Sequence, residues 1–268
     1  MDLQAIFDRL WTDYIFNNPS AKKVYDLFIE EGETVVNDHI AFRTFQHPAI
    51  GIDQLAMVFL KNNYRLMGEY RFEKKKLFAK HFEHQTDKNA PRVFISELIL
   101  DSFSFYLQQI VKGWVASIPF DSIRADEIIF SGNLSGPSSH TVFEKLRQES
   151  EYAAWLYVNG FCANHFTVSV NHLQKLNSVR KVNTFLKLKG FLLNDAGGEI
   201  QGKPEDLLEQ SSIKAGMVKV KFTEGVFEIP GCYYEFAKRY PDPEGNLYSG
   251  FITKSADNIF ESTNMYKK

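Results

Sequence analysis

The sequence predicts an α+β fold in which two βαβββ modules form a curved sheet, or partial barrel, around one metal cavity, with added helices. Three observations carry this prediction. Two separate stretches each run in the order strand, helix, several strands. Each stretch opens with an alternating strand in which a histidine directly follows Asp or Asn, at His39 and His165. The composition, with 44% hydrophobic residues and 24 Phe, is sufficient for a thick sheet core.

The first half of the chain supplies two helices and then the first module. Apolar residues recur at helical spacing from Leu3 to Tyr14, and a second helix starts near Ser20. The stretches that follow are rich in β-branched and aromatic residues, and turn residues separate them. Their predicted order is strand 37–45, helix 53–62 and strands 64–72, 76–84 and 92–100.

The second half begins with a mostly helical stretch and then repeats the same order. Residues 101–117 and 141–159 are predicted helices, and a Gly/Ser-rich loop at 131–140 lies between them. The elements predicted after this stretch are strand 164–170, helix 173–189 and strands near 191–194, 199–203, 217–222 and 232–240.

These elements predict the domain organisation. Two open curved sheets can pair and enclose one shared cavity, so the repeat is the most informative feature of the sequence. We therefore expect a single catalytic domain over residues 1–268. Its internal modules lie at about 35–100 and 160–240, and its helical insert lies at about 101–159.

The composition excludes several classes of protein. The formal net charge is −2, from 31 basic and 33 acidic residues, which argues against a nucleic-acid partner. The longest apolar runs are far shorter than the roughly 20 residues of a membrane-spanning helix. Two cysteines are too few for a disulfide framework, and the N-terminal stretch lacks the pattern of a signal peptide. We expect a cytoplasmic protein without a membrane partner, and the sequence carries no signal for an oligomeric state.

Strand alternation brings three candidate metal ligands to one cavity. His39 and Arg43 share one face of the first strand, and His165 lies on the equivalent face of the strand that opens the second module. Glu235 lies in the middle of an aromatic strand, where a carboxylate needs a partner. Two histidines and one carboxylate form a facial triad that suits Fe(II) and oxygen chemistry, although the same ligand types also bind Zn or Mn. A single histidine at the head of a strand is more often a hydrogen-bonded structural residue, and it is the repeat-related placement of His39 and His165 that brings the metal-site interpretation level with the structural one.

Arg43 points to the class of substrate. Four residues of strand correspond to about 13 Å, so a long side chain leaning back toward His39 leaves a gap of about half that length. The gap fits a short linear acid with one end on the metal and a carboxylate in the guanidinium fork. A structural salt bridge is the alternative role for Arg43.

Other candidates have weaker support. Glu97 is the main rival carboxylate, and Glu228 and Glu261 are further possible ligands. His81 and His84 lie on a polar, Lys-rich strand and are expected to be solvated, His172 is a turn residue, and His47 and His140 lie in loops. The chain has no GxGxxG, P-loop, HExxH or GxSxG motif.

Several motifs in order resemble the DUF1338 family, a branch of the vicinal oxygen chelate superfamily. They are DHIAFRTF, FEKKKLFAKHFE, PRVFISEL, NHFTVSV, CYYEFAKRY and SADNIFEST, and they extend from about residue 35 to residue 264. The chain is shorter than the characterised type, with less sequence between the second histidine and the glutamate. The resemblance implies the paired βαβββ fold with added helices.

The resemblance also implies an activity and a set of site residues. It implies an Fe(2+) enzyme that converts 2-oxoadipate and oxygen to (R)-2-hydroxyglutarate and carbon dioxide, late in lysine breakdown. By motif match, His39, His165 and Glu235 would be the metal ligands and Arg43 would bind the distal carboxylate of a 2-oxo dicarboxylic acid. Lys254 and Ser255 would be further substrate-binding residues. The alternatives are a metal-dependent isomerase or hydrolase of the same fold, or a metal-free module that binds a small acid.

Overall fold

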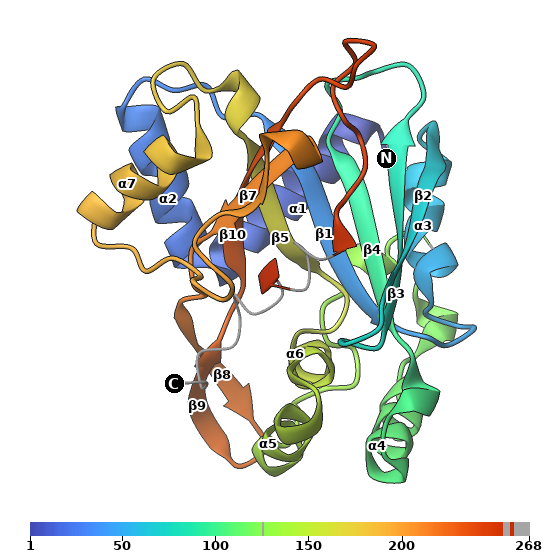
Figure 1. The fold of residues 1–268 in the computed structure, drawn as a ribbon. Helices are drawn as coiled ribbons and strands as arrows, with labels where there is room; N and C mark the ends of the chain where they lie inside the picture. Colours follow the sequence, from blue (N-terminus) through green and yellow to red (C-terminus); the bar gives the residue numbers. More distant parts are fainter. Residues whose placement is uncertain (125, 254–257, 260–268) are drawn as a thin grey trace.

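A single curved sheet of eight strands forms the centre of the molecule (Figure 1). The structure is a computed structural model, and it describes residues 1–124, 126–253 and 258–259. The strand order is β2-β3-β4-β1-β5-β10-β7-β6. The two halves of this order mirror each other about the antiparallel pair of β1 and β5 in the middle.

The first half of the sheet is one βαβββ unit. Its first and last strands, β1 and β4, are parallel neighbours, while β3 pairs antiparallel with both β4 and β2. The elements are β1 (Asn37–Phe45), α3 (Ile52–Leu60), β2 (Tyr64–Phe72), β3 (Leu77–His84) and β4 (Arg92–Leu98).

The second half repeats this pairing. Strands β5 and β10 are parallel neighbours, and β7 pairs antiparallel with both β10 and β6. The elements are β5 (Ala163–Ser169), α7 (Val179–Leu188), β6 (Gln201–Lys203), β7 (Leu208–Ser212) and β10 (Tyr233–Arg239). Two further strands between β7 and β10, β8 (Met217–Phe222) and β9 (Gly225–Pro230), form a separate two-stranded sheet. The strand order confirms the predicted α+β fold of paired βαβββ units.

Helices cover the face of the sheet that lies opposite the candidate metal ligands. Helices α1 (Leu3–Asn17) and α2 (Pro19–Glu30) contact β5 and β10, and α3 contacts β4. The Trp11 ring lies 5.1 Å from that of Phe166 and 5.8 Å from that of Tyr234. Phe166 and Tyr234 alternate with His165 and Glu235 along their strands, so the period of two separates an aromatic core face from a polar cavity face.

A helical stretch connects the two halves. Its helices are α4 (Phe105–Ala116), α5 (His140–Glu149) and α6 (Glu151–Asn159), with short 3₁₀ turns at Leu100–Ser102, Phe120–Ser122 and Ile128–Phe130. Further 3₁₀ turns lie at Val170–His172 and Pro204–Asp206. None of the helices in the described part of the chain is long and apolar enough to cross a membrane.

Several predicted boundaries were wrong. The predicted helix at 141–159 is two helices, because Ser150 leaves the helical conformation and its hydroxyl caps α6 at the Ala153 amide. The predicted helix at 173–189 begins at Val179, after a similar cap by Ser178. Residues 191–194 form only an isolated bridge at Leu193, and residues 217–222 lie outside the main sheet. Strand β7 was missed because its sequence, LEQSS, has little β-forming character.

Candidate metal centre

His39, His165 and Glu235 converge on one buried point. One potential ligand atom from each residue lies within 4.8 Å of the others, and no other such group occurs among the described residues. His165 Nε2 is 3.2 Å from Glu235 Oε2, and His39 Nε2 is 3.6 Å from Glu235 Oε1. The tertiary structure thus assembles the two nitrogens and one carboxylate that the sequence predicted, from strands β1, β5 and β10.

Strand register explains this convergence. Glu235 and His39 both pair with Thr167 on the intervening strand β5, so the three residues form one row across the sheet. His165 lies two residues from Thr167, in a second row with Tyr233 and Ala41. Side chains two residues apart on a strand share a face, and adjacent strands are about 4.8 Å apart. The three ligand candidates therefore occupy neighbouring positions on the cavity face.

A β-bulge precedes each histidine. Between the pairs Asn37–Val168 and His39–Thr167, strand β1 contains the additional residue Asp38. On strand β5, Asn164 is the additional residue next to His165. An additional residue breaks the alternation and re-aims the side chains, so Asp38 and Asn164 can lie beside the histidine that follows them.

The two bulge residues hold the histidine rings. Asp38 Oδ1 lies 2.8 Å from His39 Nδ1, and Asn164 Oδ1 lies 3.1 Å from His165 Nδ1. A hydrogen-bond acceptor at Nδ1 places the proton on that nitrogen and leaves Nε2 free to bind a metal. Both Nε2 atoms are the ones turned toward Glu235. The Asp or Asn before each histidine was visible in the sequence, but its role depends on the bulges.

The pKa shifts of His39, His165 and Glu235 are those expected of a buried site that binds a cation. Burial lowers the pKa of His39 and lowers that of His165 further, where the charges of His39 and Arg43 add to the effect. Burial also raises the pKa of Glu235 to about 8, although a hydrogen bond of 2.6 Å from Gln210 Nε2 opposes the shift. A buried carboxyl that faces two neutral imidazoles lacks a positive partner, and a divalent cation would supply one. The donor set therefore fits a metal ion.

Asp38 is also part of a buried ion pair. Arg239 donates from Nε to Asp38 Oδ2 at 2.7 Å and from Nη2 to Oδ1 at 2.9 Å. Burial alone would raise the pKa of Asp38, but Arg239 and His39 outweigh it and hold that pKa well below its usual range. Arg239 Nη1 donates to the carbonyls of Tyr248 and Gly250, at 3.0 and 2.8 Å. The Arg239 guanidinium thus connects the Asp38 carboxylate beside His39 to residues 240–253, here called the C-terminal segment.

This C-terminal segment lies against the ligand side of the cavity. Figure 1 shows the segment, in red, crossing the sheet on the side away from α1. The Phe251 ring packs edge-on against His39, with the ring centroids 4.9 Å apart. The same ring contacts Tyr70, His81 and Phe94. Phe251 therefore forms an apolar cover beside His39, a contact that the sequence did not predict.

Arg43 is buried with unused hydrogen-bonding capacity. It shares the cavity face of β1 with His39 and Ala41, and its Nε and Nη1 have no hydrogen-bond partner among the described residues. Its Nη1 lies 3.9 Å from Glu151 Oε1, at the outer limit of an ion pair. The guanidinium carbon lies 4.9 and 5.1 Å from the rings of Tyr152 and Trp155. A buried guanidinium in this state is suited to an anionic ligand.

The rival ligands lie elsewhere. Glu97 faces away from the site and accepts hydrogen bonds from the Ile52 amide and the Gln46 side chain. Glu228 is exposed on β9. Glu261, Lys254 and Ser255 lie outside the described residues, so their predicted roles stay predictions.

The other histidines were predicted with mixed success. The expectation that His81 is solvated was wrong, because it is 2% exposed and lies between Tyr70 and Glu83. Its Lys-rich strand suggested solvent, but β3 is an inner strand of the sheet and His81 lies on its cavity face, beside Phe94. His172 is the last residue of the 3₁₀ turn Val170–His172, in agreement with the predicted turn.

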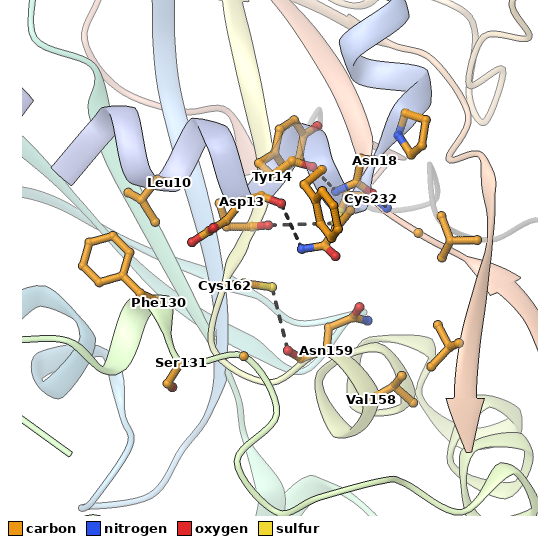
Figure 2. Close-up of a pocket in the computed structure, with 18 of the residues that line it drawn as sticks. Leu10, Asp13, Tyr14, Asn18, Phe130, Ser131, Val158, Asn159, Cys162 and Cys232 are labelled. Carbon is orange, nitrogen blue, oxygen red and sulfur yellow. Dashed lines mark hydrogen bonds between the residues drawn. The ribbon is translucent and has the colours of Figure 1, made fainter. Parts of the chain in front are cut away.

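A separate cavity of about 830 Å³ lies near α1, the 128–130 turn and β8 (Figure 2). None of the three ligand candidates lines it. The Asn18 side chain, which Figure 2 labels, already uses its oxygen to accept from the Cys232 amide and its nitrogen to donate to the Tyr14 carbonyl. Of the described residues that line this cavity, none has a buried side-chain nitrogen or oxygen without a hydrogen-bond partner, so nothing in this set marks a ligand site.

Comparison with known proteins finds a family model that matches most of the chain. The family model described as 2-oxoadipate dioxygenase/decarboxylase matches residues 12–118 and 127–246. The chain is 36% identical over 285 residues to the chloroplastic 2-oxoadipate dioxygenase/decarboxylase of Arabidopsis thaliana, in an alignment that covers 97% of this chain and 77% of the relative.

Solved structures agree with this match. The hydroxyglutarate synthase of Oryza sativa, solved in complex with 2-oxoadipate, superposes with a TM-score of 0.91 at 34% identity, covering 97% of this chain and 91% of the other. A putative hydrolase from Shewanella frigidimarina has a TM-score of 0.88 at 46% identity, covering 94% and 98%. A putative glyoxalase superfamily protein from Ralstonia eutropha, at 20% identity and a TM-score of 0.71 over 90% of this chain and 83% of the other, shares the fold. The resemblance and the fold inferred from the sequence are thereby confirmed.

Proposed function

The chain belongs to the 2-oxoadipate dioxygenase/decarboxylase family, and from this membership we propose that it is an Fe(II)-dependent enzyme that converts 2-oxoadipate and oxygen to (R)-2-hydroxyglutarate and carbon dioxide. The observation that carries the proposal is the buried set of His39, His165 and Glu235, with ligand atoms within 4.8 Å of one another. Two histidines and one carboxylate leave coordination positions open for substrate and oxygen. A role in lysine breakdown and a cytoplasmic location stay predictions.

Bound Fe(II) would supply oxygen activation and Lewis-acid polarisation of a 2-oxo acid. The chain's own contribution is to hold this ion and exclude water. Asp38 and Asn164 fix the Nδ1 protons, so both Nε2 atoms present lone pairs to the metal position. Phe251, Phe94 and Tyr70 form an aromatic wall beside His39, which limits access of water to reactive species.

Arg43 would orient the substrate. It lies four residues from His39 on the same face of β1, and two of its nitrogens have no hydrogen-bond partner in the described part of the chain. A carboxylate at the far end of a six-carbon acid would accept hydrogen bonds from these nitrogens while the 2-oxo acid end reaches the metal. Tyr152 and Trp155 hold the guanidinium plane in place, so the orienting group is preorganised.

Oxygen uptake by anaerobically Fe(II)-loaded protein tests the proposal. Addition of 2-oxoadipate and oxygen should consume oxygen and give carbon dioxide and 2-hydroxyglutarate in equal amounts, as measured by mass spectrometry. Absence of uptake with iron bound would contradict it and would favour oxygen-independent chemistry, such as the isomerase or hydrolase alternative. Absence of iron binding would instead favour the metal-free binding module.

Arg43→Gln tests the orientation of the substrate. The KM for 2-oxoadipate should rise by about a hundredfold, because a charge-assisted pair is lost in a buried site. The KM for 2-oxohexanoate, which has the same metal-binding end but no distal carboxylate, should change by less than about threefold. Equal effects on both substrates would remove Arg43 from its proposed role.

A further inference from the structure

Two neighbouring tyrosines on β10 are each buried, and the described part of the chain offers neither hydroxyl a hydrogen-bond partner. Tyr233 and Tyr234 are both 0% exposed, and neither Oη has a hydrogen-bond partner among the described residues. A buried hydroxyl without a partner costs free energy, and such groups in native proteins call for an explanation. Because the residues are adjacent on a strand, their side chains point to opposite faces of the sheet.

Tyr234 lies on the helix-covered face. Its ring contacts Trp11 and Phe236, with centroid distances of 5.8 and 5.7 Å, and it belongs to the main apolar core. No metal-ligand candidate lies on this face of β10. The Tyr234 hydroxyl therefore lies on the face of the sheet opposite the candidate metal ligands.

Tyr233 lies on the cavity face, in the row of His165 and Ala41 and next to the row of Glu235 and His39. It pairs with His165 across the sheet, and its ring stacks on that of His165 at 4.6 Å with an interplanar angle of 27°. Glu235, two residues along β10, shares its face, and the charges of Glu235 and Arg43 both act on the phenol. The Tyr14 hydroxyl donates to the Tyr233 main-chain carbonyl, which fixes the backbone without using the Tyr233 hydroxyl.

The chemistry of the substrate decides which group can accept from this phenol. The central carbons of 2-oxoadipate carry no oxygen, so an acceptor lies either at the 2-oxo acid end or at the distal carboxylate. The ring of Tyr233 stacks on that of His165, a metal-ligand candidate, whereas the proposed function assigns the distal carboxylate to Arg43. We propose that the Tyr233 hydroxyl donates a hydrogen bond to the 2-oxo acid group of the substrate at the metal. This inference rests on the proposed function and adds a substrate-binding residue to it.

The test compares Tyr233→Phe with Tyr234→Phe, which removes an equally buried and equally unpaired hydroxyl from the other face. Anaerobic calorimetric titration of the Fe(II)-loaded proteins measures the Kd for 2-oxoadipate and for 2-oxohexanoate. Tyr233→Phe should raise both Kd values by about ten- to a hundredfold, as expected for a hydrogen bond to a charged group. Tyr234→Phe should leave both within about twofold of the wild-type values.

A second measurement needs no ligand. Thermal unfolding of the metal-free proteins should show that neither substitution lowers Tm, because each removes an unsatisfied group and keeps the ring. A lower Tm for Tyr233→Phe alone would reveal a structural partner for the hydroxyl and would overturn the inference.

The binding data contain two further contrary outcomes. Unchanged Kd values for Tyr233→Phe would overturn the inference, and a rise confined to 2-oxoadipate would place the hydroxyl at the distal carboxylate instead. If the wild-type protein binds neither acid, the proposed function fails first, before any variant is compared.

Discussion

The two halves of the sheet hold their histidines with the same backbone device but different chemistry. In both halves a β-bulge residue, Asp38 or Asn164, lies beside the Nδ1 atom of the histidine that follows it. Asp38 is charged and belongs to a buried ion pair with Arg239. Asn164 is neutral, and its Nδ2 has no hydrogen-bond partner among the described residues.

The repeat therefore accounts for the shared position of the bulge residue beside each histidine, while the charge of that residue determines which further interactions it needs. A buried charge requires a countercharge, and Arg239 provides it while also binding the carbonyls of Tyr248 and Gly250. The first histidine is thus connected to the C-terminal segment, whereas Nδ1 of the second histidine contacts the neutral side chain of Asn164. Substitution of equivalent residues in the two halves separates the contribution of side-chain position from that of charge.

The largest effect is expected from removing the ligands themselves. His39→Ala and His165→Ala should each lower the affinity for Fe(II) or Co(II) by more than about a hundredfold, because a two-ligand site binds divalent ions weakly. The losses should be similar, since each half contributes one equivalent nitrogen. Metal titration with a chelator as competitor measures both affinities, and circular dichroism checks that the fold is retained.

His172→Ala is the matched control for these variants, because His172 contacts Ser169 and is not part of the metal group. It should leave the affinity unchanged. Retention of full metal affinity by either His39→Ala or His165→Ala would remove that histidine from the site.

A smaller effect that distinguishes the halves is expected at the bulge residues. Asp38→Asn should lower the free energy of unfolding by about 3 kcal/mol, because it leaves the buried Arg239 guanidinium without its countercharge. Asn164→Ala should cost about 1 kcal/mol or less, because one neutral hydrogen bond is lost. Asn164→Ala should also weaken metal binding by about ten- to a hundredfold, since His165 loses its orienting partner, whereas Asp38→Asn keeps an acceptor oxygen beside His39 Nδ1 and should weaken metal binding less.

Denaturant unfolding and metal titration measure the two quantities separately. Equal stability losses for Asp38→Asn and Asn164→Ala would show that charge does not distinguish the halves. Unchanged metal affinity in Asn164→Ala would show that this bulge residue does not orient His165.

An effect on stability alone, smaller than that of Asp38→Asn, is expected at the glutamates that hold the loops before helices α7 and α3. Glu33 accepts from the amides of Gln174, Lys175 and Leu176 at 2.6–2.9 Å, and Glu97 accepts from the Ile52 amide at 3.2 Å. Glu33→Gln should therefore cost about 1–2 kcal/mol of unfolding free energy, and Glu97→Gln less than about 1 kcal/mol.

The cost at Glu33 should depend on pH. Burial would raise the pKa of Glu33, but the three main-chain amides outweigh it and lower the pKa below its usual value. A lowered pKa contributes stability that is fully present above the unfolded-state pKa of about 4.3 and is lost as the pH falls through the folded-state value. The stability difference between wild type and Glu33→Gln should accordingly shrink in acid, as urea unfolding at several pH values measures. A difference that does not change with pH would contradict this assignment.

Much of the fold and the site could be predicted from local patterns. Strand alternation placed His39 and Arg43 on one face and His165 on the equivalent face of the second module, and the structure shows both arrangements. The same alternation failed for His81, because a local pattern does not show whether a strand is central or at an edge. It also missed β7, whose polar side chains are mostly buried, with Gln210 hydrogen-bonded to Glu235 and Ser211 hydrogen-bonded to Asn183 of α7.

The sequence by itself determined the fold class and the strand faces of the candidate metal-ligand residues, because side-chain direction has a fixed period of two along a strand and 3.6 along a helix. The tertiary structure decided the rest. In the folded chain, Glu235 and His39 pair with the same residue of β5, and a bulge lies next to each histidine. Asp38 binds Arg239, which is 201 residues away in the sequence. These features depend on strand register and on packing between distant segments, and a local pattern of residues does not specify its partner.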